Sequence, residues 1–133
     1  MTKTDYESLA AFRYAIRKYL HFSEQAAHGL GLTPQQYQAL LAIEGFPGRN
    51  RITIGELAEQ LQIAAHSAVG LADRLQTAGL IERRASQEDR RCVFVLLTPR
   101  GRKVLHQLAT AHRKELSTVG SLLVGLIKRV NQL

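Results

Sequence analysis

The chain of 133 residues has little of what defines several classes of protein. Its single cysteine, Cys92, excludes a disulfide framework within the chain and a zinc site built from cysteines. No apolar run approaches the roughly 20 residues that a membrane-spanning helix needs. The first residues, MTKTDYESLAAFRY, carry acids and no apolar segment, unlike a secretory signal. These absences predict a cytoplasmic protein without a membrane partner.

Patterns for catalysis and cofactor binding are also missing from the sequence. It has no glycine-rich phosphate loop. Its five histidines do not form a compact cluster with acids or cysteine, so we expect no metal site. His66 and Ser67 are adjacent, and neighbouring residues of a helix point apart, which argues against a nucleophile and its base. We therefore expect neither an enzyme nor a cofactor.

Basic residues are concentrated in one part of the chain. The net charge is +7, and the stretch from Arg74 to Lys103 holds eight Lys or Arg residues against three acids. A basic region of this kind favours an anionic partner such as nucleic acid.

Capping signals mark the starts of the expected helices. Apolar residues spaced three and four apart predict a first helix from Tyr6 to about Gly29. Thr33 and Thr53 each have Gln or Glu three residues later, which is the spacing of a capping box, so each is expected to start a helix. A fourth helix is expected before Gly79, with a core face formed by Ala68, Leu71, Ala72 and Leu75.

Two strands and two more helices complete the expected order. Residues 80–84 and 92–97 are expected to pair as a hairpin across the polar connector 85–91. Thr98 and Pro99 then start a fifth helix that runs to about Leu116. A last helix carries an apolar stripe of Val119, Leu122, Leu123, Leu126, Ile127, Val130 and Leu133. Helix, turn, helix and hairpin in this order predict a mainly α fold with a small β-hairpin wing (α+β), a winged helix-turn-helix with N- and C-terminal dimerisation helices.

The fourth helix is the expected reader of DNA. Recognition helices contact bases with their N-terminal residues, and His66, Ser67, Val69 and Gly70 lie there, away from the core face. His66 can donate to guanine and Val69 can contact a thymine methyl group, whereas Gly70 permits close approach. Arg74 lies on the flank of the same helix and is a further candidate contact.

The hairpin supplies further candidate contacts with DNA. Arg84, Arg90 and Arg91 are expected there because the negative potential of a narrow minor groove attracts arginine. Asp89 precedes Arg91 by two residues and is expected to hold its guanidinium in a bidentate pair. The alternative interpretation is a polar turn with a surface ion pair of little energetic value.

Four stretches resemble the multiple antibiotic resistance regulator (MarR) family of transcription factors. They are LTPQQYQALLAI (32–43), TIGELAEQLQI (53–63), DRLQTAGLIER (73–83) and DRRCVFVLLTPRG (89–101). The last is the most specific, since wings of this family carry Asp-x-Arg, an alternating strand, Leu-Thr and a glycine three residues after the threonine. The chain departs from the family at Ala64 and Ala65, where a Ser or Thr cap is usual, and at Gly70, where a long polar side chain is common.

The resemblance implies one domain over residues 1–133, with dimerisation helices at about 1–30 and 99–133 and a DNA-binding part at about 32–98. It implies an obligate homodimer, whose first, fifth and sixth helices interlace, on a pseudo-palindromic operator in double-stranded DNA. By the same resemblance Arg91 is the wing arginine, Asp89 is its anchor and Asp73 can also pair with wing arginines. The apolar stripes of the terminal helices independently favour a dimer, because a lone chain would leave them partly exposed.

Members of this family commonly bind aromatic or phenolic acids between the dimerisation helices and the winged part. The candidate ligand contacts here are Phe12, Arg13, Tyr19, Tyr37 and Phe46. Aromatic residues at helical spacing are also typical of a core, so both interpretations stay open.

The expected function is that of a sequence-specific transcriptional repressor, released from its operator by a small ligand, with aromatic acids as candidates. Two alternatives remain: a winged-helix module that docks on an acidic protein, and an architectural DNA binder without a preferred site. Steep loss of affinity with salt would separate DNA binding from the first alternative, and preference for a palindrome over random duplex would exclude the second.

Overall fold

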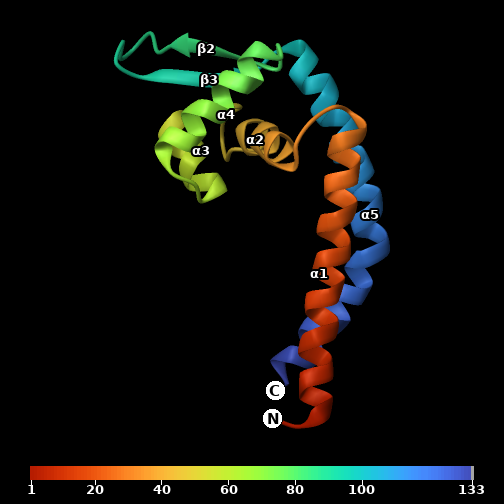
Figure 1. The fold of residues 1–133 in the computed structure, drawn as a ribbon. Coiled ribbons are helices and arrows are strands. Elements are labelled where there is room, and N and C mark those ends of the chain that lie inside the picture. The colour runs from red at the N-terminus through yellow and green to blue at the C-terminus, as the bar shows by residue number, and fades with distance from the viewer. Residues whose placement is uncertain (133) are drawn as a thin grey trace.

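The computed structural model describes residues 1–132, which form five helices and three strands (Figure 1). The helices are α1 (Lys3–Gly29), α2 (Pro34–Glu44), α3 (Ile54–Leu61), α4 (Ala65–Thr77) and α5 (Pro99–Asn131). The strands are β1 (Arg51–Thr53), β2 (Ile81–Ala85) and β3 (Val93–Leu97). This mainly α fold with a small antiparallel sheet confirms the expected fold class.

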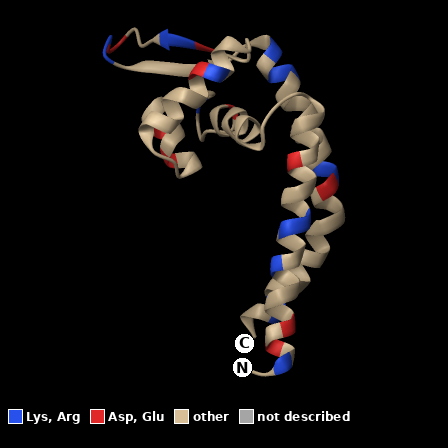
Figure 2. Ribbon diagram, in the orientation of Figure 1, with Lys and Arg blue, Asp and Glu red and all other residues tan. Residues whose placement is uncertain are grey.

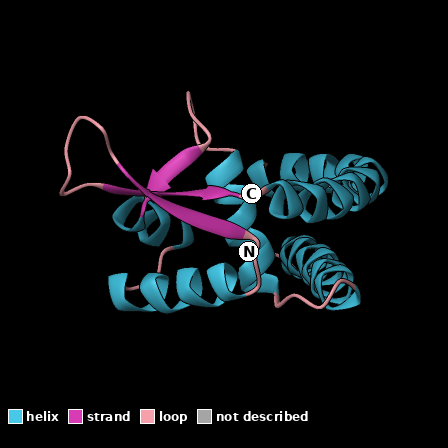
Figure 3. Ribbon diagram, turned by 90° about the horizontal axis from the view of Figure 1, so that it is seen from above, coloured by secondary structure: helices cyan, strands magenta, loops and turns pink. Residues whose placement is uncertain are grey.

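Two long helices form a stalk, and the other elements form a compact module at one end of it. α1 and α5 lie side by side and run in opposite directions, so both ends of the described chain lie at the far end of the stalk (Figure 1). The strands lie beside the module's helices, away from the paired stalk helices (Figure 3). The hairpin of β2 and β3 therefore projects from the end of the molecule that carries α4.

The sheet has the order β1-β3-β2, and both pairings are antiparallel. Its inner face is apolar and almost fully buried, and consists of Ile52, Ile81, Val95 and Leu97. These side chains join those of α2, α3 and α4 in one core. The short strand β1 was not expected from the sequence, because three residues carry little local signal and its pairing with β3 spans more than 40 positions.

The capping signals confirm the predicted starts of three helices. The hydroxyls of Thr33 and Thr53 accept from the backbone N–H of the third helical residue, and each capping box is complete. Thr98 caps α5 in the same way through the N–H of Gly101. Gly79 has a φ of 75°, so the left-handed conformation expected after α4 is present. Short-range hydrogen bonds of this kind are readable from the sequence because both partners lie within three residues.

The predicted break near Leu116 is wrong, because α5 continues without interruption from Pro99 to Asn131. The hydroxyls of Ser117 and Thr118 donate to the carbonyl of Lys114 within the helix and so do not start a new one. The described chain thus has five helices instead of six, and the last member of the predicted stripe, Leu133, lies outside the described residues. The first helix also starts earlier than expected, at Lys3, because Thr2 and Asp5 form a capping box.

None of the helices within residues 1–132 is both long and apolar enough to cross a membrane.

The start of α5 is fixed against the turn that follows α4. The hydroxyl of Thr98 donates to the carbonyl of Gly79 at 2.6 Å, and its N–H donates to the carbonyl of Leu80 at 3.1 Å. A Cβ atom added to Gly101 would lie 2.0 Å from the carbonyl oxygen of Leu80. Only glycine therefore allows the stalk helix to approach the module so closely.

Replacing Gly101 with alanine is expected to destabilise the fold by about 3 kcal/mol or more, because backbone atoms on both sides would have to move apart. Urea denaturation of the variant and of the original chain measures the difference. Gly55→Ala is the matched control, since the added Cβ would meet only Thr53 Oγ1 at 3.9 Å, and it should be neutral or stabilising by up to about 1 kcal/mol. Equal stability of the two variants would contradict the close contact at Gly101.

Candidate nucleic-acid interface

One face of α4 is buried and the other is open to solvent. Its inner face is formed by the predicted residues Ala68, Leu71, Ala72 and Leu75, which are at most 1% exposed. On the opposite side His66, Ser67 and Arg74 are exposed, Val69 is 43% exposed and Gly70 is half-buried. Val69 leaves apolar surface uncovered beside polar groups, which makes this face available for contact with a partner.

The N-terminus of α4 carries no side-chain cap. Ala64 occupies the capping position and offers no hydrogen bond, and the first turn contains no acid. The first backbone N–H groups of this exposed helix start are therefore free to donate. Free donors and the positive end of the helix dipole favour an anion. The alanines that depart from the family pattern thus leave the helix start open.

The connector at the hairpin tip is held by backbone and hydroxyl hydrogen bonds. The N–H of Ser86 donates to the carbonyl of Cys92 at 2.8 Å, and Ser86 Oγ accepts from the N–H groups of Glu88 and Asp89. The predicted side-chain pair of Asp89 and Arg91 is wrong. Asp89 Oδ1 accepts instead from the backbone N–H of Arg91 at 3.0 Å, since this two-residue spacing in a turn brings the carboxylate to the backbone.

Arg90 and Arg91 are exposed at this tip. Figure 2 shows basic and acidic residues together at the far end of the hairpin. Because Asp89 fixes the turn and leaves the Arg91 guanidinium unpaired by its carboxylate, both arginine side chains extend from an ordered backbone. The tip thus carries the exposed arginines that the sequence predicts. Its turn is held by the hydrogen bond from the backbone of Arg91 to Asp89, in place of the predicted side-chain pair.

An arginine that the sequence analysis did not single out links α4 to the wing. Arg83 of β2 donates to Asp73 Oδ1 at 2.8 Å and also to the side-chain oxygen of Gln76, and both acceptors lie on α4. Asp73, predicted to pair with a wing arginine, therefore pairs with Arg83 in the strand and not with the tip. The alternating pattern of the strand IERRA could have indicated this role of Arg83, because it places Arg83 on the same side of β2 as the buried Ile81.

Arg84, also predicted to contact DNA, lies on the other side of β2. Its Nη2 is 2.6 Å from Glu82 Oε1, and the two side chains share the outer face of the sheet. The structure thus brings Arg83 toward α4 and turns Arg84 away from it.

The five candidate ligand contacts are not gathered at one place. Tyr37 is 5% exposed and stacks on His112 with ring centroids 4.4 Å apart, and Tyr19 meets the same ring edge-on. Phe12 is half-buried and Arg13 is exposed on α1. Phe46 lies elsewhere, under the guanidinium of Arg49 at 4.5 Å. Tyr37 and Phe46 thus take part in core packing, which was the alternative interpretation.

His112 is the buried polar centre of the junction between stalk and module. One ring nitrogen, Nδ1, lies 2.6 Å from the carbonyl of Leu108, and Nε2 lies 2.8 Å from Ser23 Oγ. Burial, and secondarily the charge of Glu115, raise the pKa of Tyr19. Burial, and secondarily Tyr19, raise the pKa of Tyr37. Both tyrosines therefore keep their protons at neutral pH and pack as neutral rings.

A charged pair fixes the edge of the sheet near Phe46. Arg49 donates to the carboxylate of Glu56, which also accepts from the backbone N–H of Thr53. Burial raises the pKa of Glu56, but the hydrogen bonds of Thr53 and Arg49 outweigh it and hold the pKa below its ordinary value of 4.5. Glu56 thus stays ionised and keeps its pair with Arg49 at neutral pH.

Residues 1–132 show no group of three or more His, Cys, Asp and Glu side chains that could hold a metal ion. The stalk, the helix-turn-helix and the three-stranded wing define a winged helix-turn-helix protein. Within this class, residues 30–91 match a family model described as MarR family. Over this stretch the chain is similar to the MarR family, in agreement with the resemblance stated from the sequence.

Comparison with individual proteins agrees with this similarity. The chain is 29% identical over 104 residues to the HTH-type transcriptional repressor YetL of Bacillus subtilis, a match that covers 77% of this chain and 61% of YetL. A MarR family protein from Bacillus stearothermophilus has the same fold, with a TM-score of 0.79 at 20% identity over 99% of this chain and 96% of that one. A substituted form of S. aureus MepR bound to an oligodeoxyribonucleotide gives a TM-score of 0.70 at 22% identity, over 83% of this chain and 79% of that one.

The Arg83–Asp73 pair is expected to show a coupling free energy of about 0.5–1 kcal/mol in a double-mutant cycle with alanine, read from urea denaturation. Arg83 has only 26% of its side chain exposed, which reduces screening by solvent. The Arg84–Glu82 pair, with side chains 69% and 41% exposed, is the matched control and should give a smaller coupling free energy. Equal or greater coupling in the control pair would argue against a specific link between α4 and the wing.

Proposed function

We propose that this chain is a sequence-specific DNA-binding transcriptional repressor that acts as a homodimer and leaves its operator when a small ligand binds. The observation that carries the proposal is the open face and uncapped start of α4 beside a basic hairpin. YetL is a transcriptional repressor by name, and the MepR structure contains an oligodeoxyribonucleotide, which supports the same role here.

In this proposal α4 enters the major groove with its N-terminal half. His66 and Ser67 donate to base edges or phosphate, and Val69 contacts a thymine methyl group. The free N–H groups after Ala64 bind a backbone phosphate, and Gly70 allows the helix to come close. Because Gly70 itself reads no base, most of the selectivity is assigned to His66, Val69 and the deformability of the site.

The hairpin adds a contact in the flanking minor groove. Arg90 and Arg91 at the tip enter it, where the potential is negative, and Arg74 contacts phosphate from the flank of α4. The Arg83 bonds to Asp73 and Gln76 hold the hairpin to α4, so that both elements meet the duplex as one unit. The outward Arg84 is less suited to this contact than the sequence suggested, since it lies on the sheet face turned away from α4.

A second copy of the chain is proposed to cover the apolar surface of the stalk. Several large apolar side chains of the stalk remain exposed even though α1 and α5 pack against each other: Tyr6, Tyr14, Leu20, Leu116, Leu122, Val124 and Ile127. Exposed patches of this kind mark interfaces. Two-fold pairing through α1 and α5 would present two α4 helices to the half-sites of a palindrome.

Release requires a ligand that binds more tightly to a dimer whose two modules are spaced differently than in the DNA-bound dimer. Such a ligand lowers DNA affinity by no more than its differential affinity for the two states. The packing of Tyr19, Tyr37 and His112 joins α1, α2 and α5, so changes at this junction would alter how the module sits on the stalk.

Replacing Arg91 with alanine is expected to lower affinity for operator DNA about tenfold, because the variant loses a minor-groove contact. Fluorescence anisotropy on duplexes from the chain's own upstream DNA and on random duplex, each at two salt concentrations, measures the loss and the selectivity. Arg113→Ala removes one exposed charge from the stalk and should leave affinity nearly unchanged. Unselective binding by the original chain would contradict the proposed function, and an Arg91 variant equal to the control would remove the wing from the contact.

Replacing Leu122 with glutamate is expected to shift the chain from dimer to monomer, because a charge would enter an apolar interface. Sedimentation velocity measures the oligomeric state. The matched control is Leu41→Glu, since Leu41 is 44% exposed on α2, outside the stalk, and its variant should stay dimeric. A monomeric original chain at micromolar concentration would contradict the proposed assembly.

A further inference from the structure

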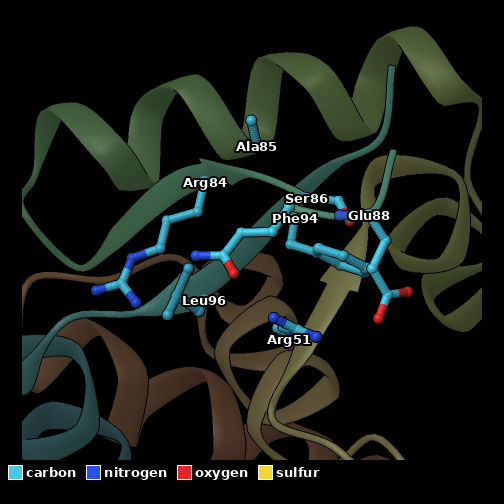
Figure 4. A pocket seen from close by; sticks show the side chains of 8 residues that line it. Arg51, Arg84, Ala85, Ser86, Glu88, Phe94 and Leu96 are labelled. Atoms are coloured by element: carbon cyan, nitrogen blue, oxygen red, sulfur yellow. Dashed lines mark hydrogen bonds between the residues drawn. The ribbon is translucent and has the colours of Figure 1, made fainter. Parts of the chain in front are cut away.

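A cleft lies on the outer face of the sheet, away from α4. Its floor consists of Phe94 and Leu96 from the central strand β3, and the register places Arg51 of β1 and Arg84 of β2 on opposite sides of that floor. The connector residues 86–88 close one side, and the enclosed volume is about 300 Å³ (Figure 4). This volume is at the lower end of the range for small-molecule sites, so the cleft takes one small molecule or one unit of a longer chain.

The middle of the cleft is a flat surface on which a ring can stack. The guanidinium of Arg51 lies over the ring of Phe94, 4.5 Å from its centroid, and that of Arg49 lies 5.8 Å from the same ring. Planar guanidinium groups stack on aromatic rings, so the Arg51 group presents its other face to a second ring. Nucleobases are flat rings that bind proteins by stacking of this kind on aromatic and arginine side chains.

The two ends of the cleft carry opposite charges. Arg84 lies at one end, and Glu88 lies at the other (Figure 4). The ion pair of Arg84 with Glu82 leaves guanidinium N–H groups free, and 69% of the Arg84 side chain is exposed. None of the ion pairs within residues 1–132 involves the Glu88 carboxylate, so its oxygens are free to accept hydrogen bonds. A ligand that uses the whole cleft therefore has an anion at one end, donors at the other and a flat ring between them.

This requirement distinguishes among simple ligands. A small aromatic acid has the anion and the ring but brings no donor to Glu88, and inorganic phosphate has no ring. Adenine and cytosine present a ring-nitrogen acceptor beside their amino group, and a carboxylate repels that acceptor. Guanine instead presents two adjacent N–H donors, from its ring N1 and its amino group, and they match the two oxygens of one carboxylate.

We propose that this cleft binds a guanine nucleotide. The base stacks on the Arg51 guanidinium above Phe94, and its N1 and amino N–H groups donate to Glu88. The phosphate accepts hydrogen bonds from Arg84, and the amide of Gln87, which also lines the cleft, donates to the guanine carbonyl. A free nucleotide and an unpaired guanosine of a single strand present the same edge. In duplex DNA this edge is paired with cytosine, so the duplex does not compete for the cleft.

The proposed site is separate from the surfaces described above. Arg84 faces away from α4, whereas Arg83 on the same strand faces toward it. None of the side chains of the Tyr19–Tyr37–His112 junction lines the cleft. Binding can therefore be measured without duplex DNA, and its result does not depend on whether the chain is a repressor.

The test is a titration of the full chain with guanosine monophosphate (GMP), followed by amide chemical shifts in NMR and by calorimetry. The largest shifts are expected at residues 84–88 and 94–96. Adenosine monophosphate (AMP) and guanosine should each bind at least about tenfold more weakly, because the first loses the paired donors and the second lacks the phosphate. Benzoate has the ring and the anion without the donors, and it should also bind at least about tenfold more weakly.

Two variants separate the ends of the cleft. Arg84→Gln should weaken GMP about tenfold or more and leave guanosine unchanged, because only the contact with phosphate is lost. Glu88→Gln should lower the preference for GMP over AMP about tenfold, because a glutamine amide offers one acceptor where the carboxylate offers two. The readout is this ratio, since losing the negative charge favours both nucleotides. Arg17→Gln, exposed on α1, is the matched control and should leave all affinities unchanged.

A comparison of single strands distinguishes the two sources of the nucleotide. A short thymidine strand with one central guanosine is measured against the strand of thymidines alone, and GMP is then added to each complex. Tighter binding of the guanosine strand, with displacement by GMP, assigns the cleft to single strands. Equal binding of the two strands, without displacement by the GMP that itself binds, assigns the cleft to the free nucleotide.

Several outcomes overturn the proposal: no binding of GMP at millimolar concentration, shifts confined to α1 and α2, or an unchanged ratio of GMP to AMP affinity in Glu88→Gln. Equal binding of benzoate and GMP would reduce the cleft to a general site for flat anions and would also overturn it. Circular dichroism checks that each variant is folded. If Arg84→Gln does not fold, Glu88→Gln decides, because this exposed side chain lies in the connector, outside the strands.

Discussion

The contact of Gly101 with the carbonyl of Leu80 is the constraint on which the arrangement of the molecule depends. At this point α4 has just ended, β2 begins, β3 has ended and α5 starts. Thr98 holds the same junction through two hydrogen bonds, to Gly79 and to Leu80. Because the stalk helix meets the module here without an intervening linker, any dimer formed through the stalk sets the positions of both α4 helices.

The arginines of the hairpin have different roles because they lie at different positions in the fold. Arg83 and Arg84 are adjacent in the sequence and lie on opposite faces of one strand. The first binds α4 through Asp73, and the second borders a cleft on the outer face. Arg91 extends from a turn that Asp89 fixes through the backbone. A proposed DNA contact, an internal link and one side of an outer cleft thus occupy a single hairpin.

The expected placement of side chains was correct where it depended on one helix and incomplete where it depended on several elements. The exposed and buried faces of α4 follow from helical spacing, and the structure shows both. The ring packing around His112 joins three helices, and Ser23 lies 89 positions away from its partner. No local pattern could show that Tyr19 and Tyr37 meet there while Phe46 packs against Arg49.

The sequence by itself determined the starts of α2, α3 and α5, the core face of α4, the turn at Gly79 and the hairpin, because each depends on partners that lie close together in the sequence. The tertiary structure alone decided the pairing of β1, the unbroken course of α5, the partner of Asp73 and the cleft between Arg51 and Arg84. These features need strand register or contacts between separate elements. Their partners are set by how apolar faces pack together, which no single stretch of the chain specifies.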